Sequence, residues 1–247
     1  MKILGVIPAR FASSRFPGKP LIDIQGKSMI QRVYEQSKAS SSLSGVIVAT
    51  DDARIYDHVS GFGGDVMMTG TNHPSGTDRC QEVLEKAGSG FDYVINIQGD
   101  EPFIDPSQID LLAALLDGQT ELATLIIKID TSELVFDTGE VKVVLNTRGE
   151  AMYFSRSPIP FLKGYPEKEW HTLHTYYRHV GLYGYRADIL GAITKLPPSA
   201  LEKAESLEQL RWIENGFRIR TGITVFDSHC IDSPDDIEKA IRLMKKQ

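Results

Sequence analysis

Short apolar runs alternate with amphipathic stretches over the first part of the chain. The runs, rich in Ile and Val as buried strands are, cover residues 3–7, 46–49 and 93–97. The stretches between them carry apolar residues at helical spacing and cover 29–38, 53–60 and 77–87. Because strands that alternate with helices form βαβ units, this pattern predicts a parallel sheet covered by helices.

The pattern changes after residue 122, where strand-like runs follow one another with fewer helices between them. These runs cover 122–129, 141–145, 151–155 and 180–185 and predict an inserted mixed or antiparallel section at roughly 122–190. The remaining segments predict a helix over 201–216, a strand over 221–226 and a helix from Pro234 to the end. No linker-like composition divides the chain, so we predict one domain over 1–247.

Composition and net charge indicate a globular protein and a small anionic ligand rather than nucleic acid. A chain of 247 residues that is 41% hydrophobic and 24% charged has enough apolar residues for a globular core. Its net charge of −6 argues against a general nucleic-acid-binding surface, so a phosphate ligand would be held by local cations. With two cysteines, no leader-like start and no long apolar run, we predict a cytoplasmic protein without a disulfide framework or membrane insertion.

The first predicted strand leads into a loop that contains Arg10, Arg15 and Lys19. Ligands of open α/β sheets bind beyond the carboxyl ends of the strands, so these cations predict a site for a phosphate-bearing ligand. The loop is not a Walker A motif, because Ser13 and Pro20 stand where that motif has Gly and Ser or Thr. A solvated basic surface loop is the alternative.

Two aspartates predict a magnesium site. Asp100 follows an apolar strand, and Asp232 lies between a strand-like run and a helix. Magnesium prefers one or two carboxylates together with substrate phosphates and water. The alternative roles are a loop cap for Asp100 and a helix cap for Asp232. Similarly, Ser75-Gly76-Thr77 begins a helix whose free amides attract anions, although Ser75 or Thr77 could simply cap that helix.

Further polar residues point to a small polar ligand. Arg156 follows a strand, a placement that suits capture of a carboxylate, and Gln98 offers both a donor and an acceptor to sugar hydroxyls. His171, His174 and His179 do not have the spacing of a zinc motif, and no Cys or acid completes a zinc tetrad. The Gly-x-Ser-x-Gly elbow of hydrolases is absent.

Several segments, in order, resemble the bacterial cytidylyltransferase family that makes CMP-Kdo, where Kdo is 3-deoxy-manno-octulosonate. They are Ile7-Pro8-Ala9-Arg10, Ser14-Arg15-Phe16-Pro17-Gly18-Lys19-Pro20-Leu21, Gln98-Gly99-Asp100-Glu101-Pro102, Tyr153-Phe154-Ser155-Arg156, Gly181-Leu182-Tyr183-Gly184-Tyr185 and Leu207-Glu208-Gln209-Leu210-Arg211. The resemblance covers almost the whole chain. It implies a Rossmann-like, dinucleotide-binding-like nucleotidyltransferase fold with an inserted dimerisation section. It also implies the reaction of CTP with Kdo, with Mg²⁺, in lipopolysaccharide biosynthesis, and a homodimer.

The resemblance also implies roles for individual residues. Arg10, Lys19 and Asp100 would be catalytic, and Asp100 and Asp232 would bind the metal. The CTP site would consist of Pro8, Ala9, Arg10, Ser13, Arg15, Lys19, Ser75, Gly76, Thr77 and Gln98. The Kdo pocket would consist of Gln98, Arg156, His179, Tyr185, Glu208 and Gln209. Two alternatives stay open: an enzyme for another acidic sugar, such as an amino analogue of Kdo or a sialic acid, and a sugar- or nucleotide-binding regulator on the same scaffold.

Overall fold

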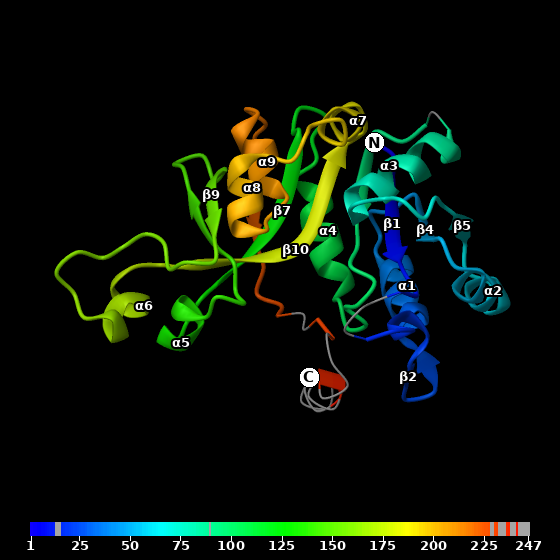
Figure 1. Ribbon diagram of the computed structural model, residues 1–247, viewed down its shortest axis with the longest axis horizontal. Helices are drawn as coiled ribbons and strands as arrows, with labels where there is room; N and C mark the ends of the chain where they lie inside the picture. Colours follow the sequence, from blue (N-terminus) through cyan, green and yellow to red (C-terminus); the bar gives the residue numbers. More distant parts are fainter. Residues whose placement is uncertain (13–15, 89, 228–229, 232–235, 238–240, 242–247) are drawn as a thin grey trace. The chain divides into compact units, whose positions relative to one another are not determined.

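The structure is a computed structural model that describes residues 1–12, 16–88, 90–227, 230–231, 236–237 and 241. The chain divides into two compact units, Met1–Ala114 with Ser228–Gln247, and Leu115–Asp227 (Figure 1). We call them unit 1 and unit 2. Within the described ranges, no helix combines the length and the apolar character needed to cross a membrane.

Unit 1 contains a parallel sheet, as the alternating pattern predicts. The strands lie in the order β6 (Tyr93–Asn96), β1 (Ile3–Ala9), β4 (Gly45–Thr50) and β5 (Val66–Met68). The helices are α1 (Met29–Ala39), α2 (Ala53–Gly61), α3 (Gly76–Ala87) and α4 (Pro106–Ala114), with a 3-10 turn η1 (Lys19–Leu21) and a short hairpin of β2 (Asp23–Ile24) and β3 (Lys27–Ser28).

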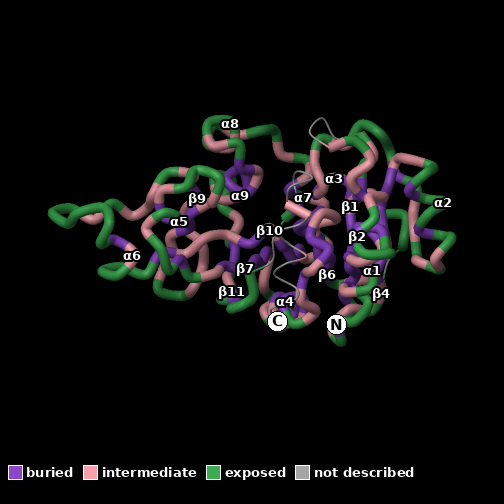
Figure 2. Tube along the Cα trace, turned by 90° about the horizontal axis from the view of Figure 1, so that it is seen from below, coloured by how far each residue is buried: buried purple, intermediate pink, exposed green. Residues whose placement is uncertain are grey.

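Helices cover both faces of the unit 1 sheet. Helix α1 packs against β1 and β4, and α3 packs against β1, β4 and β6, on the other side of β1 (Figure 2). Most residues of β1, β4 and β6 are therefore buried, which explains why these strands are rich in Ile and Val. Ser28, Asp52 and Ser75 each accept a hydrogen bond from a first-turn N–H of α1, α2 and α3 respectively, so local sequence defines where these helices begin.

Unit 2 is built around a mixed sheet. Strand β7 (Leu122–Lys128) pairs in parallel with β11 (Ile219–Ile223) and antiparallel with β10 (Tyr177–Arg186). Strand β8 (Lys142–Leu145) pairs antiparallel with both β10 and β9 (Ala151–Ser155). The helices are α5 (Ser132–Phe136), α6 (Trp170–Leu173), α7 (Ala187–Ile193), α8 (Ala200–Glu205) and α9 (Gln209–Glu214), with a 3-10 turn η2 (Glu167–Glu169). The mixed strand directions confirm the change of pattern seen after residue 122.

The single helix predicted over 201–216 is wrong. Two helices, α8 and α9, occupy this range, and Ser206 between them has a left-handed φ of 53° that ends α8. The break directs the side chain of Leu207 toward the core, where Leu207 is 6% exposed. Helix-forming composition on both sides of Ser206 hides this break, because the burial of Leu207 is a tertiary effect. The predicted strand over 221–226 is found two residues earlier, as β11, and the last predicted helix lies largely outside the described residues.

Gly99 allows the chain after β6 to pass very close to the end of β1. A Cβ atom at residue 99 would lie 2.7 Å from the carbonyl oxygen of Pro8. This neighbour is a backbone atom, which cannot rotate away as a side chain can. The glycine therefore sets how closely the loop containing Asp100 approaches the loop that follows β1.

We predict that Gly99→Ala destabilises the protein by about 1–3 kcal/mol, because the added methyl group forces the two loops apart. Urea unfolding measures this change. Gly61→Ala is the matched control, since a Cβ at Gly61 meets nothing within 4 Å and α2 gains a better helix former. Equal stability of the two variants would contradict the proposed contact.

Candidate active site

Lys19 and Asp100 form an ion pair at the carboxyl ends of the unit 1 strands. Lys19 lies in η1, after β1, and Asp100 follows β6, which is the neighbour of β1 in the sheet. The Lys19 Nζ atom lies 2.8 Å from Oδ2 of Asp100 and 2.8 Å from the carbonyl oxygen of Ile231. The side chains are 14% and 25% exposed, so solvent screens this pair only in part. Two of the three predicted catalytic residues are thus in contact.

The second carboxylate oxygen of Asp100 fits a cation. Oδ1 is buried and accepts no hydrogen bond within the described part of the chain. A buried carboxylate oxygen without a donor is costly, and a divalent cation would satisfy it. No cluster of three or more His, Cys, Asp or Glu among the described residues could hold a metal ion.

The basic loop after β1 is anchored by an aromatic ring. Gly18 has a left-handed φ of 73°, and its N–H donates to the carbonyl of Phe11 over 3.0 Å. The Phe11 ring packs on Gly18, where a Cβ would meet the ring at 3.2 Å. On the ring lies the guanidinium of Arg54, 3.3 Å from the centroid. These contacts hold the backbone that presents Lys19.

The other residues predicted for CTP gather at the same sheet edge. Pro8 and Ala9 end β1, and the exposed Arg10 that follows donates to the carbonyl of His73. Ser75 caps α3, as the simpler alternative proposed. The next residue, Gly76, lies beside Pro8, since a Cβ there would be 3.5 Å from the Pro8 ring. Thr77 is buried in the first turn of α3, and Gln98 lies in the loop after β6.

A buried arginine fixes the start of α3, and the sequence prediction missed it. Arg79 is fully buried and donates to Thr69, after β5, and to Oδ2 of Asp51, after β4, over 3.1 Å. It therefore joins the first turn of α3 to the ends of two strands. The carboxylate that neutralises it lies 28 residues away, so sequence spacing gave no signal of the pair.

In unit 2, Arg156 is held mainly by backbone carbonyls. Its Nε atom donates to the carbonyl of Glu205 over 2.9 Å, and its Nη1 atom donates to the carbonyl of Thr138 over 3.2 Å. The Glu205 carboxylate accepts from the Arg156 backbone N–H and from the Ser155 hydroxyl, over 3.0 and 2.7 Å. Among the described residues no carboxylate pairs with the guanidinium, so its charge is available to an acidic ligand. Sequence analysis did not identify Glu205.

His179 lies beside a bulge in β10. The register between β10 and β7 shifts between Val180 and Tyr183, and the Thr124 hydroxyl lies 2.7 Å from the carbonyl of Leu182 and 3.0 Å from Nε2 of His179. Burial, with a smaller contribution from the Arg178 charge, lowers the pKa of His179 from 6.5 to about 3. The imidazole is therefore neutral at physiological pH.

Tyr185 belongs to a cluster of aromatic rings that includes Trp212 of α9, the helix that Glu208 and Gln209 begin. Tyr185 is fully buried and stacks on Tyr183, and both rings meet Trp212 of α9 edge-on, with centroids 5.7 and 5.1 Å from it. Glu208 precedes α9, and Gln209 begins it and is 6% exposed. The hydroxyl of Tyr183 and the indole N–H of Trp212 are buried without a hydrogen-bond partner in the described part of unit 2.

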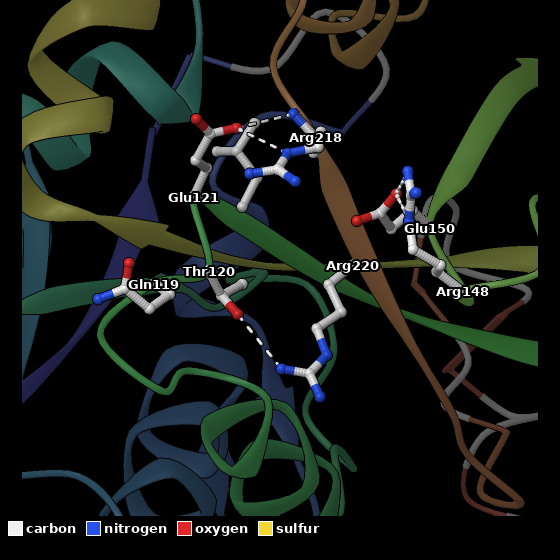
Figure 3. A pocket seen from close by; sticks show the side chains of 8 residues that line it. Gln119, Thr120, Glu121, Arg148, Glu150, Arg218 and Arg220 are labelled. Carbon is white, nitrogen blue, oxygen red and sulfur yellow. Dashed lines mark hydrogen bonds and ion pairs between the residues drawn. The ribbon is translucent and has the colours of Figure 1, made fainter.

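A separate cavity of about 290 Å³ in unit 2 contains none of the predicted residues (Figure 3). Its lining consists of Gln119, Thr120, Glu121, Leu122, Arg148, Glu150, Arg218 and Arg220. The arginines face carboxylates: Arg148 lies 2.9 Å from Glu150, Arg220 lies 2.9 Å from Asp117, and Arg218 lies 4.0 Å from Glu121. Because these charges are balanced locally, the cavity does not offer the excess of cations that a nucleotide requires.

Three predicted site residues, Ser13, Arg15 and Asp232, lie outside the described residues. The remaining CTP residues and Asp100 come together in unit 1. Gln98 also belongs to unit 1, whereas the other predicted Kdo residues belong to unit 2.

Comparison with known proteins identifies the family. The cytidylyltransferase family model matches residues 4–221. The 3-deoxy-manno-octulosonate cytidylyltransferase of Parabacteroides distasonis is 54% identical, over 99% of this chain and 98% of that protein. The enzyme of the same name from Cytophaga hutchinsonii is 53% identical, over 96% of this chain and 95% of that protein.

A solved structure agrees with the sequence relatives. The structure of a CMP:2-keto-3-deoxy-manno-octonic acid synthetase complexed with CTP has a TM-score of 0.92 and 44% sequence identity, covering 100% of this chain and 99% of that chain. This similarity confirms the Rossmann-like nucleotidyltransferase fold predicted from the sequence. The chain belongs to the cytidylyltransferase family and, within it, to the 3-deoxy-manno-octulosonate cytidylyltransferases, also called CMP-Kdo synthetases.

Proposed function

We propose that this protein transfers the cytidylyl group of CTP to Kdo, giving CMP-Kdo and pyrophosphate for lipopolysaccharide biosynthesis. The observation that carries the proposal is the Lys19–Asp100 pair at the sheet edge, with one carboxylate oxygen buried and without a donor in the described residues. A cation beside an acid of this kind suits a triphosphate and its metal. Relatives at 53–54% identity with the Kdo enzyme name support the choice of sugar.

In the reaction, the anomeric hydroxyl oxygen of Kdo attacks the α-phosphorus of CTP in line. The bond from that phosphorus to the bridging oxygen breaks, pyrophosphate leaves and the hydroxyl proton is released. No side chain has to act as a nucleophile, so the protein positions the reactants and balances charge. Arg10 and Lys19 bind the β- and γ-phosphates and stabilise the negative charge that grows on the leaving group. Pro8, Ala9, Ser13, Arg15, Gln98 and the Ser75-Gly76-Thr77 turn complete the CTP site.

Magnesium is the proposed metal, with Asp100 and Asp232 as its protein ligands. The buried oxygen of Asp100 without a donor among the described residues supports this choice for Asp100. Bound there, Mg²⁺ supplies Lewis-acid polarisation of phosphate oxygens. Lys19 contributes by orienting the Asp100 carboxylate through its 2.8 Å contact with Oδ2.

Arg156 is the proposed carboxylate-binding residue for Kdo, and its orientation by two backbone carbonyls supports this role. His179, Tyr185, Glu208 and Gln209 are the remaining unit 2 residues of the proposed sugar site. The Thr124 hydroxyl donates to the carbonyl of Leu182 and so accepts from the Nε2–H of His179, which leaves Nδ1 of the neutral ring to accept a hydrogen bond from a sugar hydroxyl.

One assay tests the function: pyrophosphate release from each nucleoside triphosphate with Kdo, its amino analogue or a sialic acid. Release with CTP and Kdo alone supports the proposal. Preference for another acidic sugar would replace Kdo as the substrate, and binding of CTP without release in any combination would favour a regulator.

We propose further that the protein is a cytoplasmic homodimer that associates through unit 2. Large apolar side chains are exposed there: Phe161 is 73% exposed, Tyr165 is 56% exposed and Leu173 is 51% exposed. Sedimentation equilibrium is expected to give twice the monomer mass, and Phe161→Glu to weaken association. A monomeric wild type at micromolar concentration would contradict the dimer.

We predict that Asp100→Asn lowers kcat for CMP-Kdo formation at least about 100-fold, because the loss of a metal-binding charge removes several kcal/mol of transition-state stabilisation. The Asn side chain keeps the shape of Asp, so the circular dichroism spectrum stays unchanged. Asp105→Asn is the control, since within the described part of the chain the Asp105 carboxylate accepts hydrogen bonds only from Ser107, at the start of α4. Near-normal turnover of Asp100→Asn would exclude the metal role.

The lowered pKa of His179 predicts how the stability of the protein depends on pH. Between about pH 6.5 and 3 the unfolded chain binds a proton at His179 and the folded chain does not. The free energy of unfolding therefore decreases as the pH falls through this window, by at most about 1.4 kcal/mol per pH unit. Urea unfolding between pH 7.5 and 4.5 measures how the free energy of unfolding depends on pH. The slope of this dependence is expected to be shallower for His179→Gln than for the wild type, by an amount that corresponds to at most one bound proton. The exposed His174→Gln is the control, and identical slopes for wild type and His179→Gln would disprove the assignment.

A further inference from the structure

Lys142 is a buried charge that the proposed reaction does not use. Its side chain is fully buried on β8, and its Nζ atom donates to the carbonyl oxygens of Asp137 and Glu140, over 2.6 Å each. Burial lowers the pKa of Lys142, opposed by the charges of Asp137 and Glu140. An ammonium group is expensive to bury, so a position that keeps one suggests a specific task.

The two carbonyls belong to one turn, residues 137–140, between α5 and β8. The turn has further internal bonds, from the Gly139 N–H to Oδ1 of Asp137 and from the Glu140 N–H to the carbonyl of Asp137. The carbonyl of Thr138, inside the turn, accepts the bond from Nη1 of Arg156. Lys142 therefore binds the first and the last residue of the turn, and Thr138, between them, binds Arg156.

The strand pairing brings the two cations together. Lys142 lies opposite Ser155 in the β8–β9 register, and Arg156 is the residue after Ser155. The charge of Arg156 acts on the Lys142 amine, and so does the charge of Glu205, which accepts the Arg156 backbone N–H. A shift of the 137–140 turn would thus move one of the two carbonyls that orient the Arg156 guanidinium.

We propose that Lys142 is a positioning residue that fixes the 137–140 turn and, through the Thr138 carbonyl, aims the Arg156 guanidinium at the substrate carboxylate. The role of Arg156 in binding the sugar acid rests on the proposed function. The positioning itself does not, because it concerns contacts within unit 2.

The kinetic test compares Lys142→Met, Arg156→Lys and the double variant. Lys142→Met is expected to raise KM for Kdo about 10-fold while KM for CTP changes less than about 2-fold, since only the sugar acid meets Arg156. On the Arg156→Lys background, Lys142→Met should add no further increase, because its effect passes through Arg156. A purely structural Lys142 would instead change both KM values or add to the effect of Arg156→Lys, and either result overturns the proposal.

A second variant covers the case in which Lys142→Met does not fold. Thr138→Gly lies at an exposed turn position and loosens the same turn while Lys142 stays in place, so KM for Kdo is again expected to rise. Gln119→Gly is the matched control, because the exposed Gln119 also offers its carbonyl to an arginine, Arg186, over 3.1 Å. Equal KM values for Kdo in the two glycine variants would overturn the proposal.

An NMR readout separates this proposal from the proposed function. The Nε–H resonance of Arg156, assigned by its loss in Arg156→Lys, is expected to shift and to exchange faster with water in Thr138→Gly and in a folded Lys142→Met, but not in Gln119→Gly. An unmoved resonance would refute the positioning role. If the wild type released no pyrophosphate with CTP and Kdo, the proposed function would be refuted. The Arg156 resonance would still test the role of Lys142, because it does not depend on activity.

Discussion

The ion pair of Lys19 and Asp100 is the contact on which the candidate active site depends. It joins the loop after β1 to the loop after β6, and these strands are neighbours in the parallel sheet. The backbone of Gly99 lets the second loop approach the first, and Phe11 under Gly18 holds the other side. One pair of opposite charges thus fixes the geometry of the sheet edge. The other carboxylate oxygen of Asp100 is buried and has no hydrogen-bond donor among the described residues.

Unit 2 holds its cations in two ways. Lys142 and Arg156 bind backbone carbonyls, whereas Arg211 forms a bidentate pair with Glu202, at 2.8 and 2.6 Å, that closes α9 onto α8. A carbonyl orients a guanidinium without neutralising it, and a carboxylate does both. Within the described residues, this difference separates Arg156, which has no carboxylate partner, from Arg211, whose charge is neutralised by Glu202.

Much of the fold could be predicted from the sequence, because apolar periodicity and helix caps are local signals. The ranges of α1, α2 and β9 agree with the prediction within one residue at each end. The break at Ser206 could not be predicted, since both flanks favour a helix and the burial of Leu207 decides the turn. The supporting residues Arg79, Thr124 and Glu205 were missed for the same reason. Their partners are 28, 55 and 49 residues away, and nothing local marks them.

The sequence by itself determined the parallel sheet of unit 1, the cationic loop after its first strand and the resemblance to one cytidylyltransferase family. These features depend on residue order and short-range spacing, which a single chain displays directly. Tertiary structure alone decided that Lys19 meets Asp100, that a neutral His179 lies beside the bulge in β10 and that Lys142 is buried beneath the turn that orients Arg156. Each of these depends on which side chains long-range packing removes from water, and desolvation has no signature in sequence spacing.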